Sequence, residues 1–244
     1  MALFDPLHRR LVVRVVYDGP ASAGKTTNIT QLCHQFPVER RSEIYTPGAL
    51  KGRTMFFDWL EIDAGTLSGH PVRCQLLSVP GQTQRSYRRR PLIKSADTVV
   101  FVCDSSPDQL EESKRSYRLM QRYLKERGEK VPFLVQANKQ DAPNALTPRT
   151  IAEELQLPPE VSVLPARARV GEGVRDTIIA AVRSAVRYTQ GRVAEVGLMA
   201  ISGAPQTADD LFGAMLELED TADESTDNDN DENPDAVVEN PTAT

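Results

Sequence analysis

A glycine-rich segment near the start of the chain limits its possible folds more than any other feature does. The segment runs from Gly19 to Thr26 with the sequence GPASAGKT, which has the spacing GxxxxGK[ST]. It follows an apolar run, Leu11 to Tyr17, that is typical of a buried strand, and it opens a helical pattern from Lys25 to Phe36. A strand, a glycine-rich loop and a helix in this order predict a phosphate-binding loop in an α/β fold.

The residue types of this loop suit a nucleoside triphosphate with a magnesium ion. Gly19 and Gly24 permit a tight turn and a close approach of backbone N–H groups to phosphate oxygens. Lys25 supplies positive charge to the β and γ phosphates, and the Thr26 hydroxyl is a ligand for Mg²⁺. The helix that begins here directs the positive end of its dipole at the anion. The loop is therefore expected to bind the triphosphate.

A second motif, Asn138 to Asp141 with the sequence NKQD, follows the apolar run Phe133 to Ala137. A phosphate loop alone leaves ATPases, nucleoside kinases and GTPases open, and this motif separates them. A carboxylate accepts hydrogen bonds from both N1–H and the exocyclic amine of guanine, whereas adenine presents no such donor pair. We expect Asp141 to read the base, Asn138 to brace the loop and the Lys139 stem to cover the base. The two motifs together predict GTP binding.

The remaining sequence alternates between strand and helix patterns. Met55 to Ile62 and Val72 to Val79 are expected to pair as a hairpin, joined by a turn that contains Gly65, Ser68 and Gly69. The later strands and helices are expected, in chain order, at Thr98 to Cys103, Asp108 to Arg127, Phe133 to Ala137, Thr147 to Leu155, Val161 to Leu164 and Gly173 to Thr189. This alternation predicts a P-loop GTPase fold, an α/β fold with a mostly parallel central sheet flanked by helices on both faces.

Charge divides the chain into two parts. All 29 Lys and Arg lie at or before Arg192, whereas 13 of the 34 acidic residues lie from Asp209 onward. We expect a GTPase domain over residues 1–196 and an acidic, largely disordered tail over residues 197–244, because the tail has little apolar surface to bury. Within the tail, a capping pattern at Thr207 to Asp210 and an apolar stripe predict a short helix at 208–218. This helix either docks on a partner or packs back on the domain.

The segment Ser78 to Gln82, with the sequence SVPGQ, ends the third predicted strand, where a GTPase senses the γ phosphate. Gly81 can turn its amide toward that phosphate, and Gln82 can orient the attacking water. Upstream, Thr54 ends a polar segment and is placed so that its hydroxyl could complete the Mg²⁺ shell when GTP is bound. These two regions, Val38 to Thr54 and Pro80 to Lys94, are expected to differ between the two nucleotide states.

With these motifs the chain resembles the MglA-type bacterial Ras-like GTPases, a family that sets cell polarity and gliding motility. The likeness runs from Phe4 to Tyr188 and is carried by four motifs, GKTTN at 24–28, RTMFFDW at 53–59, SVPGQ at 78–82 and NKQD at 138–141. Ras-like enzymes generally have Asp at the position of Ser78, and MglA-type members have Thr there. A hydroxyl holds Mg²⁺ less firmly than a carboxylate does. Asp58 on the neighbouring strand either compensates or is a polar residue on the outer strand face.

The resemblance also implies roles for two residues that the motif chemistry alone does not assign. Arg53 would act as an arginine finger in cis after a partner reshapes the switch segments. Ala168, in the segment Arg167 to Val174, would offer its amide to the base oxygen. The implied partners are a roadblock-type, MglB-like GTPase-activating protein and effectors of polarity or motility, without nucleic acid.

Four arginines, Arg85 and Arg88 to Arg90, follow Gln82 closely. They are expected to form a solvated face or to contact the acidic tail, which would then screen the second switch from partners. No apolar run approaches the ~18 residues of a membrane span. We therefore expect a cytoplasmic protein without a transmembrane segment, recruited to a cell pole or to the inner membrane surface through partners.

The sequence thus predicts a nucleotide-dependent molecular switch that hydrolyses GTP slowly by itself and faster with a partner. The alternative is a non-hydrolysing GTP-binding scaffold that recruits partners through its tail. The expected ligands are GTP or GDP with Mg²⁺. The expected catalytic residues are Gln82 and Arg53, and Thr26 and Thr54 are the expected metal ligands. The residues expected to bind nucleotide are Gly19, Ala23, Gly24, Lys25, Thr26, Thr27, Thr54, Gly81, Asn138, Lys139, Asp141 and Ala168.

Overall fold

A seven-stranded sheet forms the centre of the computed structural model, which describes residues 3–5, 8–47, 57–67, 69–79, 86–197 and 207–227. The strand order is β3-β4-β2-β5-β6-β7, and β1 pairs with β2 beside this path. The strands are β1 (Leu3–Asp5), β2 (Arg10–Asp18), β3 (Asp58–Leu67), β4 (His70–Ser78), β5 (Thr98–Asp104), β6 (Phe133–Asn138) and β7 (Val163–Pro165).

The pairing of these strands is mostly parallel, as the alternating sequence pattern predicted. β2 pairs in parallel with β4 and β5, and β6 continues the parallel order to β7. Only the β3–β4 hairpin and the short β1–β2 ladder are antiparallel among the described strands. The carboxyl ends of β2, β4, β5 and β6 therefore meet at one edge of the sheet, which is where ligands bind in open α/β folds.

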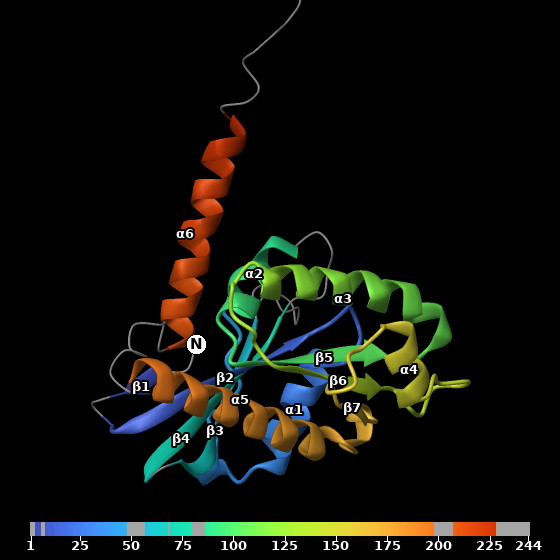
Figure 1. The fold of residues 1–244 in the computed structure, drawn as a ribbon, viewed down its shortest axis with the longest axis horizontal. Helices are drawn as coiled ribbons and strands as arrows, with labels where there is room; N and C mark the ends of the chain where they lie inside the picture. The colour runs from blue at the N-terminus through green and yellow to red at the C-terminus, as the bar shows by residue number, and fades with distance from the viewer. Residues whose placement is uncertain are drawn as a thin grey trace, which may run out of the picture.

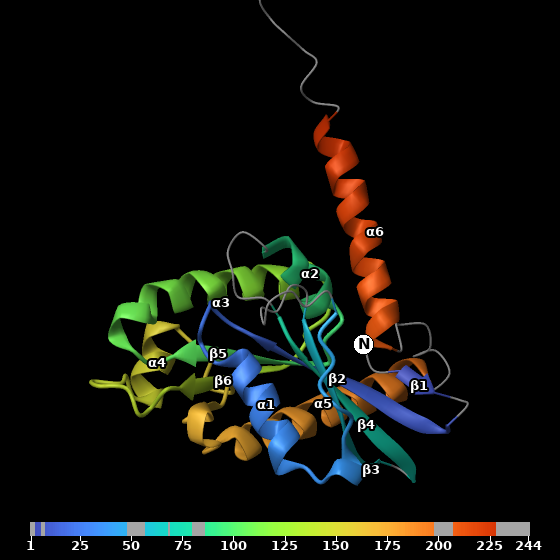
Figure 2. The same cartoon turned by 180° about the vertical axis from the view of Figure 1, so that it is seen from behind.

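Helices cover both faces of the sheet, as Figures 1 and 2 show. Apolar side chains of α1 (Lys25–Gln35) and α5 (Val174–Val196) join one buried cluster with the inward residues of β2 and β4. Side chains of α2 (Ser86–Lys94), α3 (Leu110–Lys125) and α4 (Pro148–Glu154) join a second cluster on the opposite face. The two clusters explain why the central strands are near-continuous apolar runs, since they are buried on both faces.

Three details differ from the sequence-based expectation. Gly65 lies inside β3, where the ladder to β4 shifts its register between Asp63 and Thr66, so its placement in the hairpin turn was wrong. The helix α2 was not predicted as a helix, because its charged sequence SYRRRPLIK contains Pro91. The C-terminal helix α6 spans Ala208–Asp227 rather than 208–218. None of the helices in the described ranges is both long and apolar enough to cross a bilayer.

Candidate nucleotide-binding site

The glycine-rich loop connects the end of β2 to the start of α1, and close packing requires both of its motif glycines. Gly19 has φ 143°, and a Cβ there would lie 2.3 Å from the backbone oxygen of Val102 in β5. Gly24 has φ 106° and caps α1 in the left-handed conformation, and a Cβ there would lie 2.3 Å from Nδ2 of Asn138. The first turn of α1 contains no acidic residue of its own that would repel an anion at the positive end of its dipole. This geometry suits an anion.

Lys25 is buried at the base of the loop. Its ammonium donates hydrogen bonds to the backbone oxygens of Gly19 at 3.0 Å and Pro20 at 2.6 Å. The pKa of Lys25 is lowered to about 8, chiefly by burial; the carboxylate of Asp18 opposes this shift, and the positive charge of Arg89 adds to it. A phosphate placed beside this ammonium would favour its charged form.

Asn138 joins the two halves of the site. Its Nδ2 donates to the backbone oxygen of Ala23 in the glycine-rich loop at 2.8 Å. Its Oδ1 accepts from the backbone N–H of Ala168 at 2.9 Å. One amide side chain at the end of β6 therefore fixes the phosphate loop against the loop after β7. The resemblance implied that the Ala168 amide would bind the base oxygen, but in this structure that N–H donates to Asn138 instead.

The other residues of the second motif lie in the loop that follows β6. Lys139 has φ 63°, and its ammonium donates to Oδ2 of Asp104, at the end of β5, at 2.5 Å. Gln140 donates through Nε2 to Oγ of Ser105 at 2.7 Å, which anchors the loop to the adjacent strand end. Asp141 is exposed. Its carboxylate is accessible to a base, as its expected role requires.

A buried polar network below the loops was missed by the sequence analysis. Asn28 in α1 and Gln136 in β6 exchange two side-chain hydrogen bonds of 2.8 Å. Gln136 also donates to Oγ1 of Thr177 in α5 at 3.0 Å, and that hydroxyl donates to the backbone oxygen of Gly173. The network ties the phosphate-loop helix to the last loop of the site. A glutamine in the middle of an apolar strand was the one signal that could have indicated it.

The side chains around Thr26 provide oxygen ligands for a metal ion. The Thr26 hydroxyl donates to Oδ2 of Asp58 at 2.7 Å and lies 3.5 Å from Oγ of Ser78, which is the register partner of Asp58 in the β3–β4 ladder. Thr46 donates to Oδ1 of Asp58 at 3.0 Å. Hydroxyl and carboxylate oxygens are the ligands that Mg²⁺ prefers. Thr26 and Asp58 therefore fit a magnesium ion, for which Asp58 would supply the negative charge that Ser78 lacks.

Four of the expected site residues lie outside the described residues. They are the two expected catalytic residues and the two expected switch contacts, namely Arg53, Gln82, Thr54 and Gly81. Their described neighbours are Phe57, which is fully buried, and Val79, which is 2% exposed. Thr27, in the first turn of α1, is half-buried and lies next to Thr26. The described part of the site therefore includes the phosphate loop, the base-reading loop and the candidate metal ligands.

Two arginines of the basic run after the second switch motif, Arg89 and Arg90, are engaged within the domain, and Arg85 lies outside the described residues. Arg89 of α2 donates through Nη2 to Oδ2 of Asp18 at 2.7 Å and to Oγ of Ser116 at 3.0 Å, and it is buried. Arg90 donates to Oε2 of Glu126 in α3 at 2.7 Å. A solvated face, or a contact with the acidic tail, is thus the wrong expectation for Arg89. Asp18, directly before Gly19, was not identified from the sequence.

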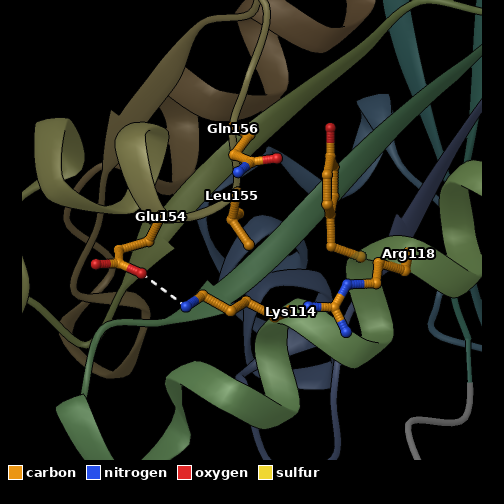
Figure 3. Close-up of a pocket in the computed structure, with 6 residues that line it drawn as sticks. Lys114, Arg118, Glu154, Leu155 and Gln156 are labelled. Carbon is orange, nitrogen blue, oxygen red and sulfur yellow. Dashed lines mark ion pairs between the residues drawn. The ribbon is translucent and has the colours of Figure 1, made fainter.

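Two hollows elsewhere on the domain are not part of this site. One of about 360 Å³ lies between α3 and the end of α4, where Lys114 pairs with Glu154 at 2.6 Å (Figure 3). The other, of about 680 Å³, lies where α3, the start of β6 and α5 meet, and its lining includes Phe133 and Tyr188. None of the described residues in the phosphate loop or the NKQD motif lines either hollow.

Comparison with known proteins agrees with this geometry. Residues 3–183 match the model of the ADP-ribosylation factor family. The chain is 32% identical over 189 residues to the mutual gliding-motility protein MglA of Myxococcus xanthus, covering 75% of this chain and 95% of that protein. It is 31% identical over 186 residues to ADP-ribosylation factor-like protein 4C of Homo sapiens and of Mus musculus, covering 72% of this chain and 85% of each relative.

Proposed function

The chain belongs to the ADP-ribosylation factor family of small GTPases, as a member of the MglA type, and on this premise we propose that it is a nucleotide-dependent switch for cell polarity or motility. It binds GTP, hydrolyses it to GDP and phosphate, and selects partners according to the nucleotide. In this proposal the phosphate loop and the NKQD motif hold the nucleotide, and regulated turnover sets the duration of the signal.

The observation that best supports this proposal is the position of Asn138. Its side chain binds the backbone of both Ala23 and Ala168, so the phosphate loop and the base loop are held as one unit. Asp141 follows three residues later and is exposed, so its carboxylate would be available to the edge of a base. Recognition of guanine by this carboxylate, together with phosphate binding at Gly24 and Lys25, is the assignment we propose.

Turnover is proposed to depend on residues in the two switch segments. Gln82 would orient the attacking water, and Arg53 would stabilise charge in the transition state after a partner contacts the switch. A magnesium ion would neutralise charge on the β and γ phosphates. Thr26 and Asp58 would hold that ion, with Thr54 as a further ligand in the GTP state. The carboxylate of Asp58 beside Thr26 supports the enzyme, because it would supply the charge for Mg²⁺ whose loss at Ser78 motivated the non-hydrolysing scaffold.

The proposed partner is a roadblock-type activating protein similar to MglB, and MglA-type membership is what supports this choice. The test is release of phosphate from bound GTP in a single turnover, with and without that partner. We expect slow release alone and a faster rate with the partner, and we expect Gln82→Ala and Arg53→Ala to remove the acceleration. Gln84→Ala is the matched control. Absence of release from the unaltered chain under both conditions would support the scaffold instead.

A further inference from the structure

The C-terminal helix α6 begins with a reciprocal cap at the surface of the domain. The backbone N–H of Asp210 donates to Oγ1 of Thr207 at 3.1 Å, and the N–H of Thr207 donates to Oδ2 of Asp210 at 3.0 Å. This is a capping box, and it fixes the position at which the helix starts. Figures 1 and 2 show α6 starting at the domain and projecting away from it toward its end. The first part of α6 is therefore the part that packs.

One face of this first part is buried. Ala208, Leu211 and Met215 are 8%, 4% and 2% exposed, and the spacing i, i+3, i+7 places them on one stripe of the helix. Leu216, on a different face, is 38% exposed. Burial of two large apolar side chains stabilises this contact by about 1.5–3 kcal/mol each. The helix is thus docked on the domain.

The buried face of α6 belongs to a cluster that includes the segments flanking the two switches. Ala208, Leu211 and Met215 belong to the same buried cluster as Phe57 and Trp59, which follow the first switch segment. The cluster also contains Leu77 and Val79, just before the second switch segment, and Leu92 and Ile93, inside that segment in α2. A partner that contacts both switch segments would therefore bind the same region of the domain as α6.

A polar contact ties α6 to the first switch segment itself. The hydroxyl of Tyr45 donates to Oδ1 of Asp209 at 2.8 Å, and this hydrogen bond raises the pKa of Tyr45. Tyr45 also exchanges two backbone hydrogen bonds, of 2.8 and 2.9 Å, with Trp59 at the edge of β3. A rearrangement of the segment that contains Tyr45 would change both the hydroxyl position and the edge against which α6 packs.

We propose that α6 is an internal competitor for partner binding. It occupies the partner surface formed by Tyr45, Trp59 and α2, and it is released when GTP rearranges the first switch segment. This inference rests on the proposed switch function. The surface fits an amphipathic helix with apolar residues at i, i+3 and i+7 and an acidic residue opposite Tyr45. In this chain the tethered occupant is α6 itself, whose sequence contains eight acidic and no basic residues.

Trp59 provides an internal reporter, because it is the single tryptophan of the chain and is 4% exposed in the shared cluster. The experiment measures its emission in the full-length protein loaded with GDP or with a slowly hydrolysed GTP analogue. The displacing variant is Leu211→Glu with Met215→Glu, and the matched control is Leu216→Glu on a more exposed face. Tyr45→Phe removes the hydrogen bond and keeps the ring. Binding of a synthetic peptide of residues 207–227 is measured in parallel.

We expect a red shift of Trp59 emission in the displacing variant and in the GTP-analogue state, but not in Leu216→Glu. The peptide should bind the displacing variant with an affinity at least about tenfold higher than it binds the GDP-loaded unaltered chain, because the tethered helix no longer competes. Tyr45→Phe should give an intermediate peptide affinity. Equal emission and equal peptide affinity in all of these proteins would overturn the proposal.

Failure of this inference is distinguishable from failure of the proposed function. A fluorescent GDP derivative, titrated into each protein, reports nucleotide binding independently of Trp59. One outcome is that GDP binds while Trp59 emission and peptide affinity stay the same in both nucleotide states. In that case α6 is a fixed part of the domain, and the competitor role is wrong. If no guanine nucleotide binds, the proposed function fails, and release of α6 by GTP fails with it.

Discussion

The guanidinium of Arg89 lies 2.7 Å from the carboxylate of Asp18, and the two side chains are 4% and 0% exposed. Asp18 ends β2 directly before the phosphate loop, and Arg89 lies in the middle of α2, inside the second switch segment. The pair therefore connects the phosphate loop to the switch helix through the interior. Breaking a buried ion pair leaves an uncompensated charge in a low-dielectric environment.

Substitution of Arg89 by Met is expected to lower the free energy of unfolding by about 3–5 kcal/mol, because Asp18 then stays buried without its partner. Urea unfolding followed by circular dichroism measures this change. Arg90→Met is the control, since its pair with Glu126 is largely exposed and worth about 0–1 kcal/mol. The double variant Asp18→Asn with Arg89→Met should recover part of the loss. Equal effects of Arg89→Met and Arg90→Met would contradict the role of the buried pair.

Asp58→Asn is expected to weaken the affinity of the nucleotide site for magnesium. The substitution keeps an oxygen beside Thr26 but removes the charge that would hold the ion. The rate of GDP dissociation is measured as a function of magnesium concentration. The Mg²⁺ concentration that keeps dissociation slow should be at least about tenfold higher in the variant than in the unaltered protein. Asp63→Asn, on the same strand but paired with Arg73, should leave the curve unchanged. An unchanged curve for Asp58→Asn would exclude Asp58 as a ligand.

Asp141→Asn is expected to change which base the protein prefers. The carboxylate accepts from N1–H and the exocyclic amine of guanine, whereas an amide offers a donor in place of one acceptor. We expect GDP affinity to fall by a factor of about 10 to 100, which corresponds to one or two lost hydrogen bonds. Xanthosine diphosphate has a carbonyl in place of that amine. The affinity for xanthosine diphosphate should therefore fall less than the affinity for GDP, or rise. Competition against a fluorescent nucleotide measures both, and equal losses for the two bases would contradict the assignment.

Nucleotide binding is expected to take up a proton at alkaline pH. The pKa of Lys25 is lowered to about 8 by burial, so at pH 8.5 much of this ammonium is deprotonated before the ligand arrives. Phosphates favour the charged form and raise the pKa, so GDP affinity should fall as pH rises above about 8. Calorimetry at pH 8.5 in two buffers with different ionisation enthalpies measures the uptake. An identical binding enthalpy in both buffers would be inconsistent with this role for Lys25.

The parts of the fold and site that were predicted from sequence are those that depend on local spacing. Gly24 and Lys25 are recognisable because loop and helix follow each other in the chain, and Asn138 because its motif follows a strand directly. The contacts made between distant segments were not predictable in this way. Asn28 and Gln136 are 108 positions apart, and nothing in either local pattern indicates the other.

The composition of α2 likewise did not predict how this helix packs. A run of arginines is usually solvated, so the burial of Arg89 against Asp18 depends on the packing of α2 over β2 and α3. The C-terminal helix was predicted from its capping box and apolar stripe, but its length was not. The acidic sequence after Leu216 carries few apolar residues, and the pattern alone favoured disorder.

The account depends on recognition of guanine by a pocket that also holds phosphates. The most direct measurement is isothermal titration of the full-length protein with GDP and with ADP in the presence of magnesium. The account predicts saturable binding of GDP at one site, with an affinity at least about a hundredfold higher than that for ADP. Comparable affinities for the two nucleotides, or no binding of GDP, would contradict it.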